Sequence, residues 1–203
     1  MARIESVCVY CGSSPGSDPL FMEEARRFGG LLARHGIRLV YGGGGVGLMG
    51  EMAGEAVRQG GAVTGIIPGF LVSRERALPY EYDLVVVEDM HERKRLMFER
   101  ADAFVALPGG VGTLEELVEQ LTWAQLGQHK KPILIANIAG FWDPFLNLLD
   151  HMRASRFMHG HASLNLVVAE SVDEILPMLE AAVAGVTDAA LHGAGDATIT
   201  ERM

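Results

Sequence analysis

The chain has 203 residues, of which 49% are hydrophobic and 21% charged, and its formal net charge is −9 at pH 7. This length accommodates one domain with a substantial core and is too short for two comfortable ones. The acidic balance argues against broad binding to nucleic acids or anionic membranes, because no basic surface is available to neutralise many phosphates. No apolar run reaches the length of a membrane span, and the first residues enter a strand-like pattern without a signal-peptide region. We therefore expect a cytoplasmic protein.

Apolar segments of strand length alternate with segments whose apolar residues have helical spacing. The predicted strands span residues 6–10, 38–41, 62–67, 84–87, 103–107, 133–137 and 166–169. The predicted helices span residues 18–35, 47–59, 90–101, 113–126, 141–152 and 172–183. Such alternation predicts βαβ units, and the near-continuous apolar character of the strands is typical of a parallel sheet buried on both faces. The prediction is one α/β domain built on a doubly wound parallel sheet.

Two segments fall outside this alternation. From about Gly185 onward the sequence is small, polar and aperiodic, which predicts a domain over residues 1–185 and a flexible C-terminal tail over 186–203. Residues 68–83, between two predicted strands, form a long polar connection. In compact α/β domains such long connections often serve as binding loops or lids.

Three predicted strands are followed by glycine-rich loops, at residues 12–16, 42–50 and 108–113. A strand, a glycine turn and a helix start leave backbone N–H groups pointing outward at the positive end of a helix dipole, which is an anion site. In a doubly wound sheet, ligands bind beyond the carboxyl ends of the strands. One such loop could equally be a tight turn, but three at one edge of a sheet favour an anionic ligand.

The glycine pattern also limits the type of nucleotide. Gly42-x-Gly44-x-x-Gly47 matches the dinucleotide fingerprint, but that fingerprint requires an acidic residue at the end of the next strand. The next predicted strand ends instead in Pro68-Gly69, and the glycines follow the second strand rather than the first. The chain also lacks the GxxxxGK[ST] pattern of P-loop proteins. A mononucleotide fits these observations better than NAD or a P-loop nucleotide.

Charged residues lie beside two of the predicted helix starts. Thr113 and Glu116 have the T-x-x-E spacing of a capping box, in which the carboxylate would bond back to the Thr113 amide. Alternatively, Glu116 faces the ligand and addresses an uncharged part of it, such as a ribose or glycosidic bond. Arg93 and Lys94 belong either to a solvated helix face or to a site that holds phosphate or ribose, since a guanidinium grips oxyanions bidentately.

The cysteines and histidines do not predict a metal site. Cys8 and Cys11 have a C-x-x-C spacing, but the chain offers no partner set for zinc, and Cys8 lies inside an apolar run. We expect buried, reduced thiols. His151, His159 and His161 lack a helix-ligand spacing and are expected on the surface or in packing contacts. Trp123 and Trp142 are expected to pack in the core or in an interface.

Several motifs together resemble those of one enzyme family. Residues 108–116 read PGGVGTLEE, which matches the P-G-G-x-G-T-x-x-E signature of the LOG family. The resemblance covers about residues 5–180 and includes YCGSS at 10–14, YGGG at 41–44, MHERK at 90–94 and TWAQLG at 122–127. Members of this family are cytokinin riboside 5′-monophosphate phosphoribohydrolases, long misnamed lysine decarboxylases.

The resemblance implies a Rossmann-like fold, a homodimer, and a reaction that needs no metal and no organic cofactor. It also implies that Arg93 and Glu116 form the catalytic pair. The residues expected to bind the nucleotide, including those of the glycine loops, are Gly12, Ser13, Gly43, Gly44, Glu75, Lys94, Gly109, Gly110, Val111, Gly112, Thr113, Leu114, Glu115 and Thr122. Val111 stands where many members have Tyr.

The lysines of the chain show whether the earlier family name, lysine decarboxylase, could describe its chemistry. The chain has three, Lys94, Lys130 and Lys131. Lys94 falls in the expected phosphate site and the other two in a turn before a strand, so we reject a decarboxylase that forms a Schiff base with pyridoxal phosphate.

The predicted function is hydrolysis of the N-glycosidic bond of adenine-type nucleoside 5′-monophosphates, namely cytokinin riboside 5′-monophosphate, AMP or both. The products would be the free base and ribose 5-phosphate. The alternative is a nucleotide-binding or carrier protein without turnover, whose glycine loops would look the same. Its partner is expected to be this small molecule, with neither nucleic acid nor membrane involved.

Overall fold

The computed structural model describes residues 4–73, 78–158 and 166–192, with the side chains of the last helix described as far as Ala184. Three residues of the sequence analysis, Glu75, His159 and His161, lie outside the described residues. The same holds for the end of the predicted tail, residues 193–203. No helix within the described ranges combines the length and the apolar character that crossing a membrane requires.

The described chain forms one parallel sheet with the strand order β4-β3-β2-β1-β5-β6-β7. Its strands are β1 (Ser6–Tyr10), β2 (Arg38–Tyr41), β3 (Val63–Pro68), β4 (Asp83–Val87), β5 (Ala103–Ala106), β6 (Ile133–Ala136) and β7 (Leu166–Ala169). Strands β2, β3 and β4 follow one another on one side of β1, and β5, β6 and β7 follow one another on its other side. The predicted doubly wound α/β domain is therefore confirmed, and its topological switch point lies between β1 and β5.

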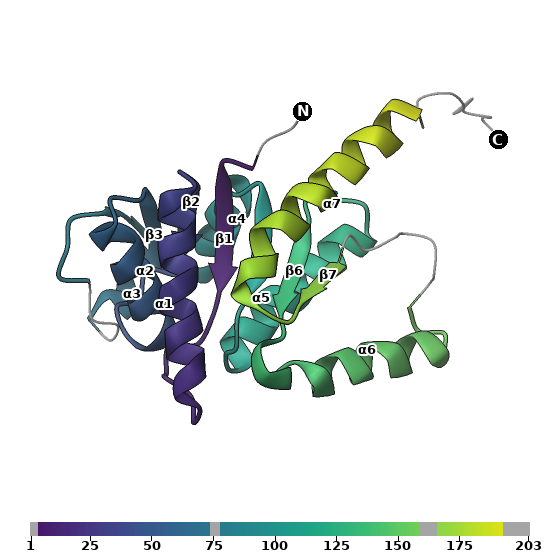
Figure 1. Cartoon of the computed structure of the whole chain (residues 1–203), viewed down its shortest axis with the longest axis horizontal. Helices are drawn as coiled ribbons and strands as arrows, with labels where there is room; N and C mark the ends of the chain where they lie inside the picture. The colour runs from purple at the N-terminus through teal and green to yellow at the C-terminus, as the bar shows by residue number, and fades with distance from the viewer. Residues whose placement is uncertain (1–3, 74–77, 159–165, 193–203) are drawn as a thin grey trace.

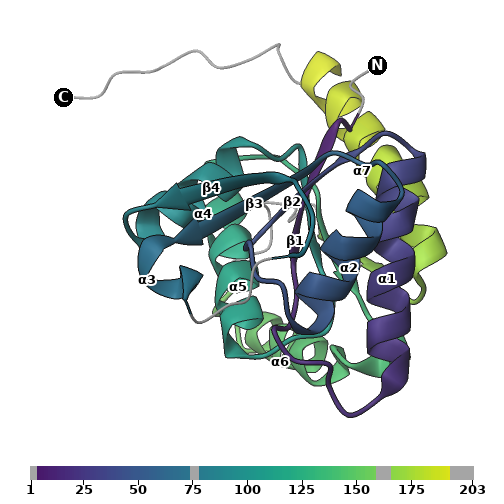
Figure 2. The ribbon, with the colours of Figure 1, turned by 90° about the vertical axis from the view of Figure 1, so that its left-hand side faces the viewer.

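Helices cover both faces of this sheet (Figures 1 and 2). On one face lie α1 (Pro19–Arg34), α2 (Gly47–Arg58) and α7 (Val172–His192). On the other lie α4 (Met90–Glu99), α5 (Val111–Gln125) and α6 (Asp143–Ala154). A short helix α3 (Gly69–Val72) and a 3-10 turn η1 (Ile138–Gly140) were not predicted.

Alternate residues of the central strand enter the two cores. Val7 and Val9 pack on the α1 side and Cys8 and Tyr10 on the α4 side, and all four are at most 3% exposed. Burial on both faces explains why the strands read as unbroken apolar runs.

The two cysteines are buried and unpaired, as expected. Cys11 packs into the core on the α1 side, whereas Cys8 belongs to the core on the opposite face of the sheet. Burial raises the pKa of both thiols above the ordinary range, so both stay protonated and unreactive. The two cysteines of the C-x-x-C motif therefore pack in separate cores and do not form a redox pair.

Helix α7 is longer than predicted. Its apolar periodicity supported a helix over residues 172–183, but the helical backbone continues to His192. Residues 186–192 continue this helix, because elongating a helix that is already nucleated requires little helix propensity from each added residue. The domain boundary at residue 185 stays a prediction.

Candidate active site

The three glycine loops meet at the carboxyl edge of the sheet. The Gly12 amide donates to the Pro108 carbonyl at 3.0 Å, and the Met49 amide donates to the Gly12 carbonyl at 3.3 Å. These bonds join the loop after β1 to the loops after β5 and β2. The close approach requires glycine at position 47, where φ is +59° and a Cβ would lie 2.3 Å from the Ser13 carbonyl carbon. The loops flank the switch point between β1 and β5, where a ligand is expected.

Helix α5 opens with backbone amides directed toward solvent. Gly110 is its N-cap and Val111, at 83% exposure, is its first residue. The first amides of a helix have no intrahelical acceptor, and a Cβ placed on Gly110 or Gly112 would meet nothing within 4 Å. The helix start is therefore open around its two glycines, as anion binding at a helix N-terminus requires.

The predicted capping box at Thr113 is wrong. The glycine loop lets α5 begin at Val111, so Thr113 is the third residue of the helix. The N-cap is Gly110, which has no side chain to accept hydrogen bonds from the first amides. Thr113 is buried instead, and its side chain fills the space beside Gly109, where a Cβ would lie 2.1 Å from Thr113 Oγ1. Glu116 is thus free of the capping role and projects from the second turn of α5.

Arg93 is anchored in the interior, against the alternative of a solvated helix face. Helix α4 begins at the N-cap Asp89, whose carboxylate accepts hydrogen bonds from two amides of the first turn. One turn later, Arg93 is 8% exposed, and it donates from Nε to the Ile66 carbonyl and from Nη2 to the Gly42 carbonyl, each at 3.1 Å. These carbonyls lie in β3 and just after β2. Two strand ends therefore fix the guanidinium, and donors on both terminal nitrogens remain available.

The structure brings the side chains of Arg93 and Glu116 together. Arg93 Nη1 lies 3.8 Å from Glu116 Oε1, and the two side chains are only 9% and 13% exposed. Burial raises the pKa of Glu116 to about 7, although the charge of Arg93 opposes this shift. A carboxyl with this pKa exists in both protonation states near neutrality, which suits a group that takes up and releases a proton.

Lys94, the next residue on α4, faces two other carboxylates of α5. Its Nζ lies 2.7 Å from Glu115 Oε1 and 2.9 Å from Glu119 Oε1, and its side chain is 16% exposed. Burial disfavours the charge, but the bonds with both glutamates outweigh it and raise the pKa of Lys94. Glu119 was not singled out from the sequence, although its i, i+4 spacing from Glu115 places both on one helix face.

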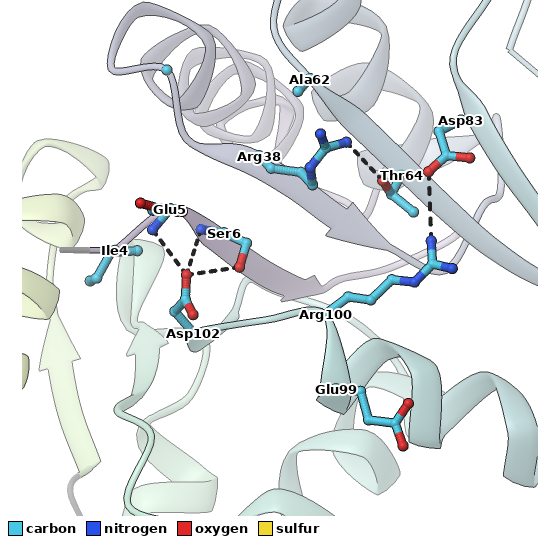
Figure 3. A pocket seen from close by; sticks show the side chains of 11 residues that line it. Ile4, Glu5, Ser6, Arg38, Ala62, Thr64, Asp83, Glu99, Arg100 and Asp102 are labelled. Atoms are coloured by element: carbon cyan, nitrogen blue, oxygen red, sulfur yellow. Dashed lines mark hydrogen bonds and ion pairs between the residues drawn. The ribbon is translucent and has the colours of Figure 1, made fainter. Parts of the chain in front are cut away.

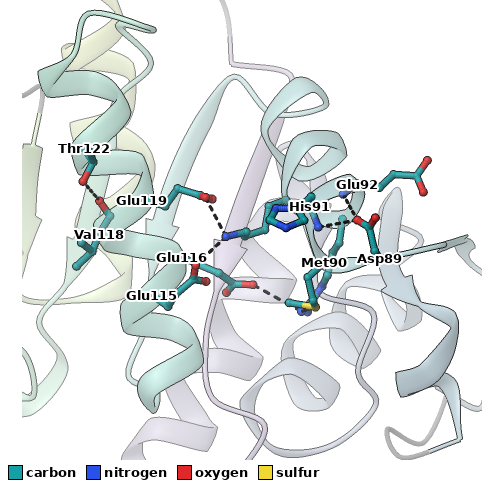
Figure 4. A network of polar contacts seen from close by, with 11 residues as sticks. Asp89, Met90, His91, Glu92, Glu115, Glu116, Val118, Glu119 and Thr122 are labelled. Atoms are coloured by element: carbon teal, nitrogen blue, oxygen red, sulfur yellow. Dashed lines mark hydrogen bonds and ion pairs between the residues drawn. The ribbon is translucent and has the colours of Figure 1, made fainter.

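The remaining predicted residues divide into two groups. Near the loops, Ser13 is exposed, Gly43 and Gly44 are buried, and Leu114 packs beside the core under α5. Thr122 is not brought to the Arg93–Glu116 pair. It lies six residues beyond Glu116, about 9 Å further along the helix, and its exposed hydroxyl donates to the Val118 carbonyl (Figure 4).

A polar cavity of about 680 Å³ lies at the opposite, amino edge of the sheet (Figure 3). Several of its polar side chains contact one another: Arg38 donates to Thr64, which donates to Asp83, and Arg100 also pairs with Asp83. Asp102 accepts hydrogen bonds from the start of β1. This cavity is remote from the glycine loops, and its contacts stabilise the ends of neighbouring strands.

The lysines do not form a site for pyridoxal phosphate. A Schiff base requires an amine that can lose its proton and reach the cofactor. Lys94 is held by two carboxylates, and Lys131 donates to the Phe98 carbonyl while lying 4.0 Å from the centre of the Phe98 ring. Lys130 is exposed. Within the described ranges, no group of three or more His, Cys, Asp or Glu side chains is placed to hold a metal ion.

Solved structures share this fold at low sequence identity. The molybdenum cofactor carrier protein of Chlamydomonas reinhardtii is 21% identical with a TM-score of 0.69, and the alignment covers 90% of this chain and 99% of that one. A molybdenum cofactor binding protein of Rippkaea orientalis is 20% identical with a TM-score of 0.65 and the same coverage. At this level of identity the likeness concerns the fold alone.

Sequence relatives are much closer. Residues 49–179 match a family model described as "Possible lysine decarboxylase". The cytokinin riboside 5′-monophosphate phosphoribohydrolase LOG of Oryza sativa subsp. japonica is 45% identical over 180 residues, which are 88% of this chain and 74% of the relative. The enzyme of the same name, LOG7, from Arabidopsis thaliana is 44% identical over 88% of this chain and 82% of its own length. The chain belongs to the LOG family of cytokinin riboside 5′-monophosphate phosphoribohydrolases.

Proposed function

We propose that this protein hydrolyses the N-glycosidic bond of adenine-type nucleoside 5′-monophosphates, either cytokinin riboside 5′-monophosphate or AMP. The products are the free base and ribose 5-phosphate. The observation that carries the proposal is the buried pair of Arg93 and Glu116 beside the meeting glycine loops. Family membership supports the same class of reaction.

In this proposal the amides at the start of α5 and the loop after β1 bind the 5′-phosphate. The proposed contacts involve Ser13 and the segment 109–113, whereas Gly12, which the sequence motifs also predict, joins the loops because its amide is already bonded to the Pro108 carbonyl. Backbone amides at a helix N-terminus favour a dianionic group without requiring a basic side chain. The binding energy of the phosphate is then used to place the sugar beside Glu116.

Glu116 and Arg93 act at the sugar. Cleavage of the glycosidic bond builds positive charge at the anomeric carbon, and a nearby carboxylate stabilises that charge. Glu116 in its ionised form also accepts a proton from the attacking water. Arg93, fixed by the carbonyls of Gly42 and Ile66, presents its remaining donors to the ribose or to the departing base.

A homodimer is also part of the proposal, as the family resemblance implies. Val111 and Val118 on α5 and Leu126, the residue that caps its C-terminus, are 83%, 42% and 68% exposed. Their spacing of seven and eight residues places them along one side of the helix, where a second copy could cover them. Thr122 lies on the same stretch of α5, away from the catalytic pair of its own chain.

Purified protein is tested with isopentenyl-AMP, AMP, GMP and the corresponding unphosphorylated nucleosides, with base and ribose 5-phosphate measured by chromatography. We expect equal amounts of both products from the adenine nucleotides and little release from nucleosides, because the nucleosides lack the group that the loops bind. A carrier without turnover would leave every nucleotide intact. Free base without ribose 5-phosphate would contradict hydrolysis.

Gly42→Ala tests the position of Arg93 without changing Arg93 itself. A Cβ at Gly42 would lie 2.1 Å from Arg93 Nη2, so the guanidinium must shift away from its anchoring carbonyl. We expect kcat to fall about 10²-fold, the cost of displacing a reacting group by roughly 1 Å. Gly54→Ala in α2 is the control, since its Cβ would make only ordinary contacts at 3.7 Å and beyond. Equal activity of both variants would remove Arg93 from the mechanism.

A further inference from the structure

The outer edge of β4 has no role in the proposed reaction. Strand β4 lies at one end of the sheet and pairs, among the described strands, with β3 alone (Figure 2). This pairing is one-to-one from Thr64 with Asp83 to Pro68 with Val87 and contains no bulge. Alternate residues of such a strand direct their N–H and C=O groups away from the sheet, where another strand can bind them. The edge of β4 is therefore a template for one more strand.

The sequence of β4 lacks most of the features that block an edge. Proteins protect edge strands with lysine, proline, bulges or a covering segment. Strand β4 reads DLVVV and contains neither lysine nor proline. Val86, near its carboxyl end, is 57% exposed, although burial of a valine is favourable. The edge thus combines free backbone groups with an exposed apolar side chain.

Helix α3 extends this apolar surface. The helix begins at Gly69, where a Cβ would lie 3.9 Å from Val86 Cγ1. Phe70 and Val72 follow on the same helix and are 55% and 41% exposed. A strand added beside Val86 would pass next to α3 and could cover part of these side chains. Main-chain hydrogen bonds and apolar contacts are the two contributions on which binding by strand addition depends.

The segment around the edge is acidic. Residues 81–92 contain five carboxylates and no lysine or arginine. Asp83 is paired with Arg100 at 3.6 Å. Glu81 and Glu88, which flank the strand on either side, are exposed, and neither has an ion-pair partner within 4.0 Å in the described part of the chain. Both ends of the edge therefore offer a carboxylate to a positively charged side chain.

An open cavity of about 640 Å³ adjoins the carboxyl end of β4. Its lining includes Val86, Glu88 and, on the first turn of α4, Glu92. Arg95 also lines the cavity, but its guanidinium is paired with Glu99 at 3.1 Å. The cavity has room for the long side chain of a lysine or arginine that extends from an added strand toward Glu88.

A second copy of this chain is a poor occupant of the edge. In an antiparallel pair of β4 strands centred on Val85, Glu81 would lie opposite Asp89 of the other copy. A shift of the register by one residue would place Glu81 opposite Glu88 instead. Like charges directly opposite each other destabilise a strand pair, and the net charge of −9 adds a general repulsion between copies. A strand with basic residues at both ends avoids these contacts.

We propose that the outer edge of β4 binds an extended, basic segment of a partner protein as an additional strand. The apolar side chains of this segment contact Val86 and α3, and its lysine or arginine side chains pair with Glu81 and Glu88. This interaction surface is separate from the pair of Arg93 and Glu116, and the proposal does not depend on hydrolysis of a nucleotide.

The test uses a short synthetic peptide, as long as the segment 81–88, in which threonine and valine alternate between two terminal lysines. One control peptide carries glutamate at both ends, and a second carries a central proline that removes a main-chain donor. We expect calorimetry to show saturable binding of the lysine peptide, weakened by added salt, and no binding of either control. The bound peptide should also slow hydrogen exchange of alternate β4 amides in NMR spectra, because these amides become hydrogen-bonded.

Glu88→Lys tests the charge requirement in the protein. It should weaken binding of the lysine peptide about tenfold, since an attraction becomes a repulsion of similar size. Glu180→Lys, at an exposed position on α7, changes the net charge by the same amount and is the matched control. It should retain the wild-type affinity. Circular dichroism of both variants checks that the fold is preserved.

Four results would overturn the proposal. The first is a lysine peptide that does not bind saturably to the wild type. The second is an equal loss of affinity in Glu88→Lys and Glu180→Lys, which would mean attraction to the overall charge alone. The third is peptide binding that leaves the exchange of the β4 amides unchanged, because the peptide then binds elsewhere. The fourth is protection of the outward β4 amides without peptide at concentrations where sedimentation shows a dimer, which would assign the edge to a second copy.

Discussion

Glu116→Gln should lower kcat for base release by about 10³-fold, within the range for loss of a general base, while AMP affinity is retained. Glutamine keeps the size of the side chain and a carbonyl oxygen, but it can neither accept a proton from water nor offer a full negative charge to the anomeric carbon. The phosphate contacts proposed at the backbone amides are untouched. Steady-state assays and calorimetry on the same preparation separate these two effects.

The pH profile of the wild type provides an independent check of this role. Because the base must be ionised and the pKa of Glu116 is raised to about 7, kcat/KM should increase from pH 6 to pH 8 and then level off. Glu180→Gln, an exposed position on α7, is the control and should retain full activity with the same profile. Substantial turnover by Glu116→Gln, or a profile without the rise near neutrality, would exclude Glu116 as the base.

The fold could be predicted from the sequence because its strands are buried on both faces. In β1, the four residues from Val7 to Tyr10 enter the two cores alternately, so the apolar run is unbroken and its length identifies a strand. The glycine loops were equally visible, since the close approach at Gly47 tolerates no Cβ. These signals are local, and each depends on a few consecutive residues.

The details of the site depend on residues that are distant in the sequence, so fewer of them could be predicted from it. The partners of Arg93 are 27 and 51 positions away, at Ile66 and Gly42, and their carbonyls carry no signal in the sequence. The T-x-x-E pattern at Thr113 was misleading because tertiary packing beside Gly109 buried the threonine and moved the helix start. The adjacency of Arg93 and Glu116 was implied by family resemblance, whereas periodicity only placed both near the same edge of the sheet.

Glu116→Gln should also stabilise the protein at neutral and alkaline pH. The pKa of Glu116 rises from 4.5 to about 7 on folding, mainly through burial. The folded state therefore binds this proton more tightly than the unfolded state. The stability that the protonated carboxyl confers is complete below about pH 4.5 and is lost as pH rises through 7. Above pH 7 the ionised side chain costs at most about 3 kcal/mol, from about 1.4 kcal/mol for each pKa unit.

Urea unfolding of wild type and Glu116→Gln over pH 4 to 8.5 measures this cost directly. At pH 4 both side chains are neutral and the two free energies of unfolding should agree. Their difference should then grow through pH 5 to 7 and reach a plateau of at most about 3 kcal/mol. A difference of this size is a substantial fraction of the free energy of unfolding of a typical domain. Glu180→Gln should show no such pH-dependent difference. If the difference in free energy of unfolding between wild type and Glu116→Gln is constant with pH, burial does not raise the pKa of Glu116. Its proton affinity would then be ordinary, and a carboxyl with an ordinary pKa would be a poor base at neutral pH.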